Sequence, residues 1–186
     1  MALAKDYQSV MGRSNEIQKE ALGLDYADFE TSPISFDYDA LMKSTGYTLD
    51  EIERIQGLHG VGNTPLLELR NITKLARKYA KPGYGARIFV KDESCNASGS
   101  FKDRRAACAV AHAKKLGYKG VMAATSGNYG AAVASQAAMQ GLKCIIVQEA
   151  YDSREVGQPE IIEKARACEA MGAEVVQITV GPELFY

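Results

Sequence analysis

Helix-length and strand-length segments alternate through the second half of the chain, and this pattern constrains the fold more than any other feature. Short apolar runs bounded by turn residues predict strands, and small apolar residues at helical spacing predict helices. In chain order the predicted elements are helix 101–116, strand 119–124, helix 128–140, strand 143–148, helix 158–171 and strand 174–179. Such alternation is typical of βαβ units that build a parallel sheet. We therefore expect an α/β fold of three layers, in which helices cover a parallel sheet.

The α/β domain is expected to span residues 61–186. Before the alternation begins, its first part is predicted to contain strand 66–69, a short helix over 72–79 and strand 87–91. A mostly helical or irregular extension over residues 1–60 precedes it, with predicted helices over 5–22, over 38–44 and from the Thr48 and Glu51 capping box onward. The extension has few periodic apolar positions, so we expect it to pack on another domain or subunit.

Composition excludes several classes of protein. The chain has 186 residues, of which 46% are hydrophobic, so it can bury a real core. Its net charge is −1, with 22 basic and 23 acidic residues interspersed, which argues against binding nucleic acid or an anionic membrane. No apolar run approaches the roughly 20 residues that span a bilayer, and the polar N-terminus lacks the apolar core of a signal peptide. We expect a cytoplasmic protein without disulfides or a metal site, because the cysteines and histidines lack ligand spacing.

A lysine stands at the start of the predicted helix 101–116, in the segment Ser98-Gly99-Ser100-Phe101-Lys102-Asp103-Arg104-Arg105. Ser100 and Asp103 have the spacing of an approximate capping box, which makes Lys102 the second helical residue. The positive end of the helix dipole disfavours an ammonium there, and a neutral amine is the form that reacts with an aldehyde. An exposed lysine that reaches water is the alternative. By spacing, the buried stripe of this helix is predicted to be Ala106, Ala109, Val110, Ala113 and Leu116.

A second loop, Thr125-Ser126-Gly127-Asn128-Tyr129-Gly130, joins a predicted strand to an alanine-rich helix. Its hydroxyls, its glycine backbone and the helix N-terminus together suit a carboxylate or phosphate. Capping and chain reversal alone would require the same residue types. Because ligands of open α/β sheets bind at the carboxyl ends of strands, this loop and Lys102 are expected at one edge of the sheet. Arg104 and Arg105 suit a solvated or ion-paired helix face, or an anionic ligand.

These segments together resemble a known family. Residues 96–104 resemble the cofactor-lysine segment of threonine synthase and its relatives, the fold type II, tryptophan-synthase-β-like pyridoxal-phosphate enzymes. Residues 125–130 resemble the Ser/Thr-x-Gly-Asn loop of that superfamily, and residues 62–66 its early Gly-Asn-Thr-Pro-Leu segment. The resemblance implies that Lys102 binds pyridoxal 5'-phosphate covalently and that Asn128 contacts the ring oxygen of the cofactor. It further implies that the substrate α-carboxylate is bound by Thr125, Ser126 and Gly127.

Within this superfamily the whole chain resembles the N-terminal part of the β subunits of 2-amino-4-oxopentanoate thiolases. These enzymes of ornithine degradation cleave 2-amino-4-oxopentanoate with coenzyme A into acetyl-CoA and alanine, together with a small α subunit. The resemblance implies a PLP-dependent transferase with an amino-acid substrate, an α-subunit partner and self-association. The chain has no coenzyme A signature, so a threonine synthase-like replacement or an ammonia-lyase-type elimination stays open.

Two readings from other classes also stay open. Gly127 and Gly130 after a strand, with Glu149 about 20 residues on, mimic a dinucleotide-binding fingerprint. Thr125 holds the place of the first glycine of that motif, so a nicotinamide-dependent oxidoreductase is the weaker alternative. A non-catalytic binding or scaffold subunit is the other.

Relatives in the superfamily bind the cofactor phosphate with a glycine-rich loop and the pyridine nitrogen with a Ser, Thr or Cys, both later in the chain. Residues 141–186 contain nothing that resembles either feature. We expect the chain to be part of a longer protein with a second, larger domain. By itself it is expected to bind the cofactor weakly and to be poorly active.

Overall fold

The computed structural model describes residues 9, 12–13, 15–16, 19–20, 23–125, 127–149 and 159–178. Most of the predicted helix 5–22 lies outside these residues. The chain forms two compact units, Met1–Leu49 and Asp50–Tyr186. The predicted boundary at residue 60 instead follows helix α4 (Leu49–Leu58). Within the described ranges, no helix is long and apolar enough to cross a membrane.

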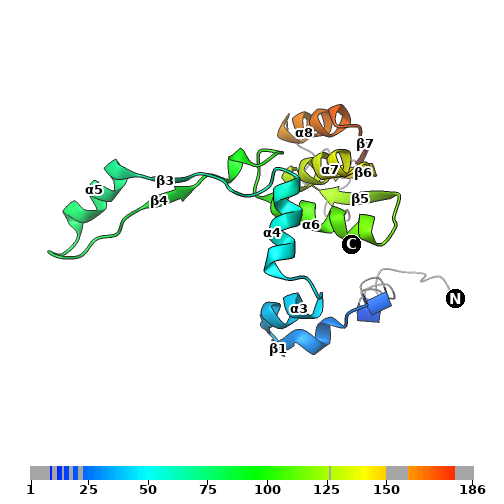
Figure 1. Ribbon diagram of the computed structural model, residues 1–186, viewed down its shortest axis with the longest axis horizontal. Helices are drawn as coiled ribbons and strands as arrows, with labels where there is room; N and C mark the ends of the chain where they lie inside the picture. The colour runs from blue at the N-terminus through cyan, green and yellow to red at the C-terminus, as the bar shows by residue number, and fades with distance from the viewer. Residues whose placement is uncertain are drawn as a thin grey trace. The chain divides into compact units, whose positions relative to one another are not determined.

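A parallel sheet of three strands organises the second unit (Figure 1). Its strands are β5 (Gly120–Thr125), β6 (Lys143–Glu149) and β7 (Glu174–Ile178), paired in chain order. The helices that alternate with them are α6 (Lys102–Lys115), α7 (Asn128–Gln140) and α8 (Pro159–Ala170). Each bound differs from its predicted position by at most one residue, so the predicted alternation and the parallel sheet are confirmed.

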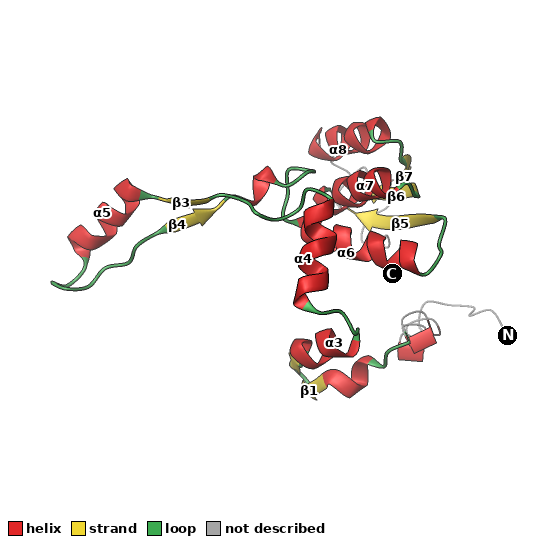
Figure 2. Ribbon diagram, viewed as in Figure 1, coloured by secondary structure: helices red, strands yellow, loops and turns green. Residues whose placement is uncertain are grey.

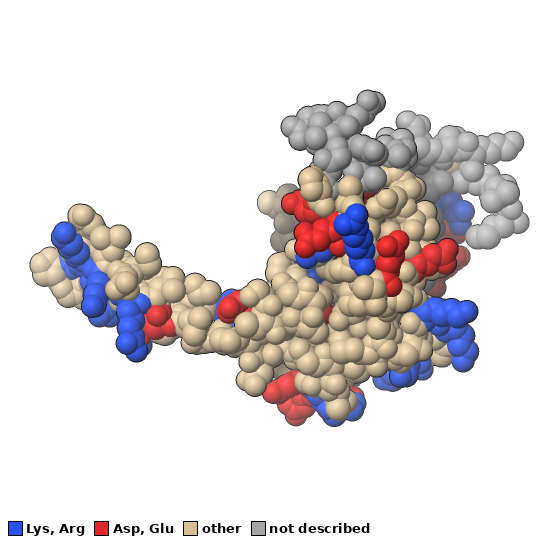
Figure 3. All heavy atoms as spheres, turned by 90° about the horizontal axis from the view of Figure 1, so that it is seen from above, with Lys and Arg blue, Asp and Glu red and all other residues tan. Residues whose placement is uncertain are grey.

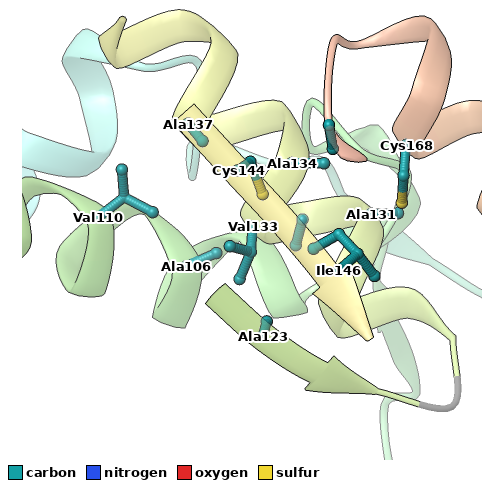
Figure 4. Close-up of a cluster of buried hydrophobic side chains, with 12 residues drawn as sticks. Ala106, Val110, Ala123, Ala131, Val133, Ala134, Ala137, Cys144, Ile146 and Cys168 are labelled. Atoms are coloured by element: carbon teal, nitrogen blue, oxygen red, sulfur yellow. The ribbon is translucent and has the colours of Figure 1, made fainter. Parts of the chain in front are cut away.

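The core lies between one face of this sheet and the three helices. Figure 4 shows Ala106 and Val110 of α6, Ala131, Val133, Ala134 and Ala137 of α7, and Cys168 of α8 around Ala123, Cys144 and Ile146 of the sheet. Helix α7 is buried along most of its length, because small residues on all its sides let α6, α8 and the sheet approach closely. The opposite face of the sheet is open, with Met122 at 72% exposure. The helices that the structure describes next to this sheet lie on the buried face.

The buried stripe of α6 differs from the predicted one. Its buried residues are Asp103, Ala106, Ala107 and Val110, whereas Ala109 and Leu116 are exposed. The observed stripe begins with Asp103, whose buried carboxylate accepts hydrogen bonds from Ser98. Cys144 and Cys168 are buried in the core, and burial raises the pKa of Cys144 to about 11.

A separate two-stranded sheet precedes α6 in the chain. Strand β3 (Leu66–Glu68) pairs in antiparallel fashion with β4 (Phe89–Lys91), and helix α5 (Arg70–Tyr79) connects them (Figure 2). The three elements match the predicted strand, helix and strand. Glu68 and Arg87 form an ion pair beside the strands, with a distance of 3.2 Å. Figure 3 shows basic side chains gathered over α5, while acidic and basic side chains alternate over the rest of the visible face.

The first unit is built around aromatic side chains. A 3-10 helix, η1 (Tyr26–Phe29), is followed by the short antiparallel strands β1 (Glu30–Ser32) and β2 (Ser35–Phe36) and by helix α3 (Tyr38–Ser44). The ring of Phe36 lies 4.9 Å from that of Tyr38 and 5.7 Å from that of Tyr26, measured between centroids. Helix α3 has its predicted bounds, whereas the small strand pair was not predicted, because two-residue and three-residue strands have no detectable periodicity.

Candidate functional site

A cavity of about 650 Å³ opens at the carboxyl end of β5, a size typical of small-molecule sites. Its wall contains four residues that the sequence singled out: Lys102, Thr125, Gly127 and Asn128. Because β5 is parallel to its neighbours, its carboxyl end meets the N-termini of the helices, so residues far apart in the chain share one wall. Ser126, the remaining predicted site residue, lies outside the described residues.

Lys102 is the first residue of α6, and its side chain is half-buried in the cavity wall. Its backbone N–H donates to the Ser100 hydroxyl at 3.1 Å. Its Nζ lies 4.6 Å from the centroid of the Phe101 ring, whose face attracts a cation. The sequence prediction that Lys102 stands at the helix start and faces a site is therefore supported by its position.

The turn before Lys102 is held differently from the predicted capping box. The carboxylate of Asp103 accepts hydrogen bonds from the backbone N–H and the hydroxyl of Ser98, both at 2.7 Å. A capping box would instead have it accept from the backbone N–H of Ser100. Gly99, between Ser98 and Ser100, has φ +79°, a backbone conformation that favours glycine. The buried Asp103 carboxylate thus fixes the loop that presents Lys102.

Thr125 shapes the second loop from inside. Its buried hydroxyl oxygen accepts hydrogen bonds from the backbone N–H groups of Gly127 at 3.0 Å and Gly130 at 3.1 Å. Gly130 is required here, because a Cβ at this position would lie 2.5 Å from the Thr125 methyl group and 3.0 Å from that of Ile146. The hydroxyl is therefore engaged in capping α7. Its predicted contact with a substrate carboxylate stays a prediction.

Asn128 opens α7 on the cavity side of the loop. It is exposed, and its side-chain amide makes no hydrogen bond with another described residue. An amide in this state can donate to or accept from a ligand without breaking a contact within the described part of the protein. Asn128 therefore suits the predicted contact with a ligand oxygen better than the engaged hydroxyl of Thr125 does.

One carboxylate, that of Glu93, joins the segment before Lys102 to the early Gly-Asn-Thr-Pro-Leu segment. It accepts from the Arg104 guanidinium at 2.6 and 2.8 Å, from the Thr64 hydroxyl at 2.7 Å and from the Asn96 amide at 3.0 Å. Asn96 in turn accepts from the N–H of Gly62 at 2.9 Å. The hydrogen bonds from Arg104, Thr64 and Asn96 lower the pKa of Glu93 to about 2. Two of the recognised motifs are thus one hydrogen-bonded unit behind Lys102.

The sequence analysis missed Glu93, because no residue pattern near it in the chain predicts that it bonds to Arg104 and Thr64. It also missed two residues of the cavity wall, Glu160 and Lys164 of α8. A topological signal for these two does exist, because the helix after β6 must begin at the same sheet edge as the helix after β5. The remaining wall residues are Arg105, Ala124 and Tyr129.

Comparisons with known proteins show which family the chain is similar to. The family model described as pyridoxal-phosphate dependent enzyme matches residues 58–184. The 2-amino-4-ketopentanoate thiolase beta subunit of Acetoanaerobium sticklandii is 73% identical over 186 residues, which cover 99% of this chain and 40% of that protein. The threonine synthase of Halalkalibacterium halodurans is 43% identical over 88 residues, 47% of this chain and 23% of that protein.

A solved structure supports the fold. The crystal structure of a pyridoxal 5'-phosphate-dependent aspartate racemase matches with a TM-score of 0.54 and 27% identity, covering 70% of this chain and 38% of that one. The chain spans about two fifths of the length of the thiolase beta subunits that it matches.

Proposed function

Because this chain belongs to the pyridoxal-phosphate dependent enzyme family, we propose that it carries the cofactor lysine, Lys102, of a 2-amino-4-oxopentanoate thiolase. The observation that carries the proposal is the 73% identity, over nearly the whole chain, to a 2-amino-4-ketopentanoate thiolase beta subunit. Ketopentanoate and oxopentanoate are two names for the same compound. Its substrates would be 2-amino-4-oxopentanoate and coenzyme A, and its products alanine and acetyl-CoA. The same relatives imply an α-subunit partner, and we expect self-association as well.

The described residues fit the cofactor. The cavity provides a primary amine at the start of α6, an amide with no partner among the described residues at Asn128, and room for a small ligand. Lys102 would hold pyridoxal phosphate covalently through Nζ, and Asn128 would contact its ring oxygen. Thr125 and Gly127 form the loop beside it, where the substrate carboxylate is proposed to bind together with Ser126.

Bound pyridoxal phosphate supplies an electron sink for a carbanion formed next to its imine. In the reaction, the thiol of coenzyme A adds to the C4 carbonyl carbon and the C3–C4 bond breaks, so the acetyl group leaves on sulfur. C3 then takes up a proton and becomes the methyl group of alanine. Lys102 is placed to carry protons at Nζ once its amine is free, because it lies half-buried in the cavity wall.

Glu93 lies outside the cavity wall, but its carboxylate is hydrogen-bonded to the helix that carries this lysine. Arg104 is on the first turn of α6, two residues after Lys102, and is held by Glu93. Movement of the first turn would therefore require the ion pair to break. We propose that this contact keeps Nζ in one place during proton transfer.

A second candidate function rests on the match to threonine synthase over 88 residues. In that reading the same lysine moves protons in an elimination or replacement at the β or γ carbon of an amino acid. Formation of acetyl-CoA distinguishes the two, because only the thiolase reaction produces a thioester.

The central test is covalent capture of the cofactor. The chain is mixed with pyridoxal phosphate, its visible absorption is recorded, and borohydride reduction is followed by peptide mapping. We expect the reduced label on Lys102, its loss in Lys102→Ala, and its retention in Lys119→Ala, an exposed lysine outside the cavity wall. A label confined to other lysines would contradict the proposal. Acetyl-CoA formation in the presence of the α subunit then tests the reaction.

A further inference from the structure

Three helices begin at the wall of the cavity. Lys102 and Arg105 come from the start of α6, Asn128 and Tyr129 from that of α7, and Glu160 and Lys164 from that of α8. The N-terminus of each helix carries roughly half a unit of positive charge. The cavity is therefore electropositive before any side chain is counted, and it suits more than one anionic group.

The side chains of the wall add to this charge. Three of them are basic (Lys102, Arg105 and Lys164) and one, Glu160, is acidic. Neither Arg105 nor Lys164 forms an ion pair with a carboxylate of another described residue. The ion pairs among the described residues are made by other lysines and arginines. Arg104, the neighbour of Arg105, is by contrast neutralised by Glu93 at 2.6 Å. Within the part of the chain that the structure describes, the cations Arg105 and Lys164 are thus left for a ligand.

Arg105 is also held in a defined place. Its guanidinium carbon lies 4.5 Å from the centroid of the Tyr129 ring, and Tyr129 packs against the hydrophobic core. Stacking on an aromatic face leaves the N–H edges of a guanidinium available, and these edges match two oxygens of a phosphate. Lys164 is half-buried and reaches the same cavity from α8.

We propose that Arg105 and Lys164 form a phosphate subsite for the nucleotide end of a co-substrate, separate from the contacts of Lys102 and Asn128. This inference rests on the proposed function, in which coenzyme A carries a pyrophosphate and a 3'-phosphate far from its thiol. Phosphates bound by these two residues of the wall would hold coenzyme A at the cavity that contains Lys102. The phosphate of pyridoxal phosphate has the same chemistry, and the test separates the two sources.

The test is isothermal titration of the 186-residue chain with coenzyme A, ADP and pantetheine, which lacks the phosphates. We expect Arg105→Gln and Lys164→Gln each to weaken coenzyme A and ADP binding by about tenfold to a hundredfold, since each removes a charge-assisted hydrogen bond to a phosphate. Pantetheine affinity should not change. Arg105→Lys should show a smaller loss. Arg166→Gln, an exposed cation on the same helix outside the cavity wall, should match the wild type.

Three results would overturn the subsite. These are a wild type that binds neither coenzyme A nor ADP, Arg105→Gln and Lys164→Gln variants that bind both as tightly as the wild type does, or a loss of affinity in the two variants only for pyridoxal phosphate. The last result, with pyridoxal and coenzyme A unaffected, would assign the cations to the phosphate of the cofactor. Circular dichroism checks that the variants fold. Borohydride labelling of Lys102 in the same variants tests the proposed function independently, so either can fail while the other stands.

Discussion

Glu93 shows how one side chain can organise a site that it does not enter. Its carboxylate accepts hydrogen bonds from Asn96 and Arg104 of the cofactor-lysine segment and from Thr64 of the early Gly-Asn-Thr-Pro-Leu segment. The hydroxyl of Thr64 and the amide of Asn96 are buried, so loss of the carboxylate would leave polar groups without partners. We therefore regard Glu93 as the residue that couples the two motifs.

The pKa of Glu93 makes this coupling measurable. The carboxyl titrates at 4.5 in the unfolded reference and at about 2 in the folded protein, so the native state binds the proton more weakly. Its stabilisation is complete above pH 4.5 and is lost as the pH falls toward 2. We expect urea unfolding to show a smaller loss of stability between pH 7 and pH 3 in Glu93→Gln than in the wild type.

Glu68→Gln is the matched control, since it removes the exposed ion pair with Arg87. Exposed ion pairs contribute little to stability because water and salt screen them, so this variant should keep most of the wild-type pH dependence. If Glu93→Gln and the wild type lost the same stability on acidification, the assigned role of Glu93 would be wrong.

At the scale of the element, the start of α7 depends on a side chain from the preceding strand. Thr125 replaces a helix cap, because its hydroxyl accepts from the N–H groups of Gly127 and Gly130. The loop geometry at the cavity is therefore tied to the end of β5. A change in this hydroxyl should affect both the stability of α7 and the loop that holds Asn128.

Thr125→Val keeps the shape of the side chain but leaves two backbone N–H groups without their acceptor. We expect it to lower the free energy of unfolding by about 1–3 kcal/mol. Thr125→Ser keeps the hydroxyl and should stay closer to the wild type. Urea unfolding gives the stabilities, and hydrogen exchange at Gly127 and Gly130 localises the effect. Equal stability of the two variants would show that the hydroxyl does not cap α7.

At the scale of the whole molecule, the chain is about two fifths as long as the thiolase beta subunits that it matches. Several apolar side chains lie exposed in the second unit, among them Leu66 and Met122. An antiparallel pair of strands is marginally stable without a third strand or a helix on its face. Both observations favour the expectation that further structure completes the site.

We predict that the 186-residue chain alone forms acetyl-CoA at a negligible rate. Its reduced cofactor label on Lys102 should require a higher pyridoxal phosphate concentration than the beta subunit of Acetoanaerobium sticklandii needs. Both proteins are assayed with and without the α subunit, by thioester formation and by labelling. Activity of the short chain comparable to that of the long one would contradict the prediction.

The sequence by itself determined the elements and predicted which single residues would line the cavity. The bounds of α6, α7 and β5 to β7 followed from apolar periodicity and turn residues, because these are local properties. Lys102, Thr125, Gly127 and Asn128 were identifiable because their motifs are continuous in the chain, and parallel-sheet topology predicts a common edge for them.

Only the tertiary structure decided which side chains serve the architecture and which face the cavity. It engaged the Thr125 hydroxyl in the cap of α7, left the Asn128 amide without a partner among the described residues, and turned α6 so that Asp103 is buried. It also brought Glu93 to Arg104 and Lys164 to the cavity wall. These outcomes depend on contacts between segments distant in sequence, and the directions of side chains across such contacts leave no local periodic signal.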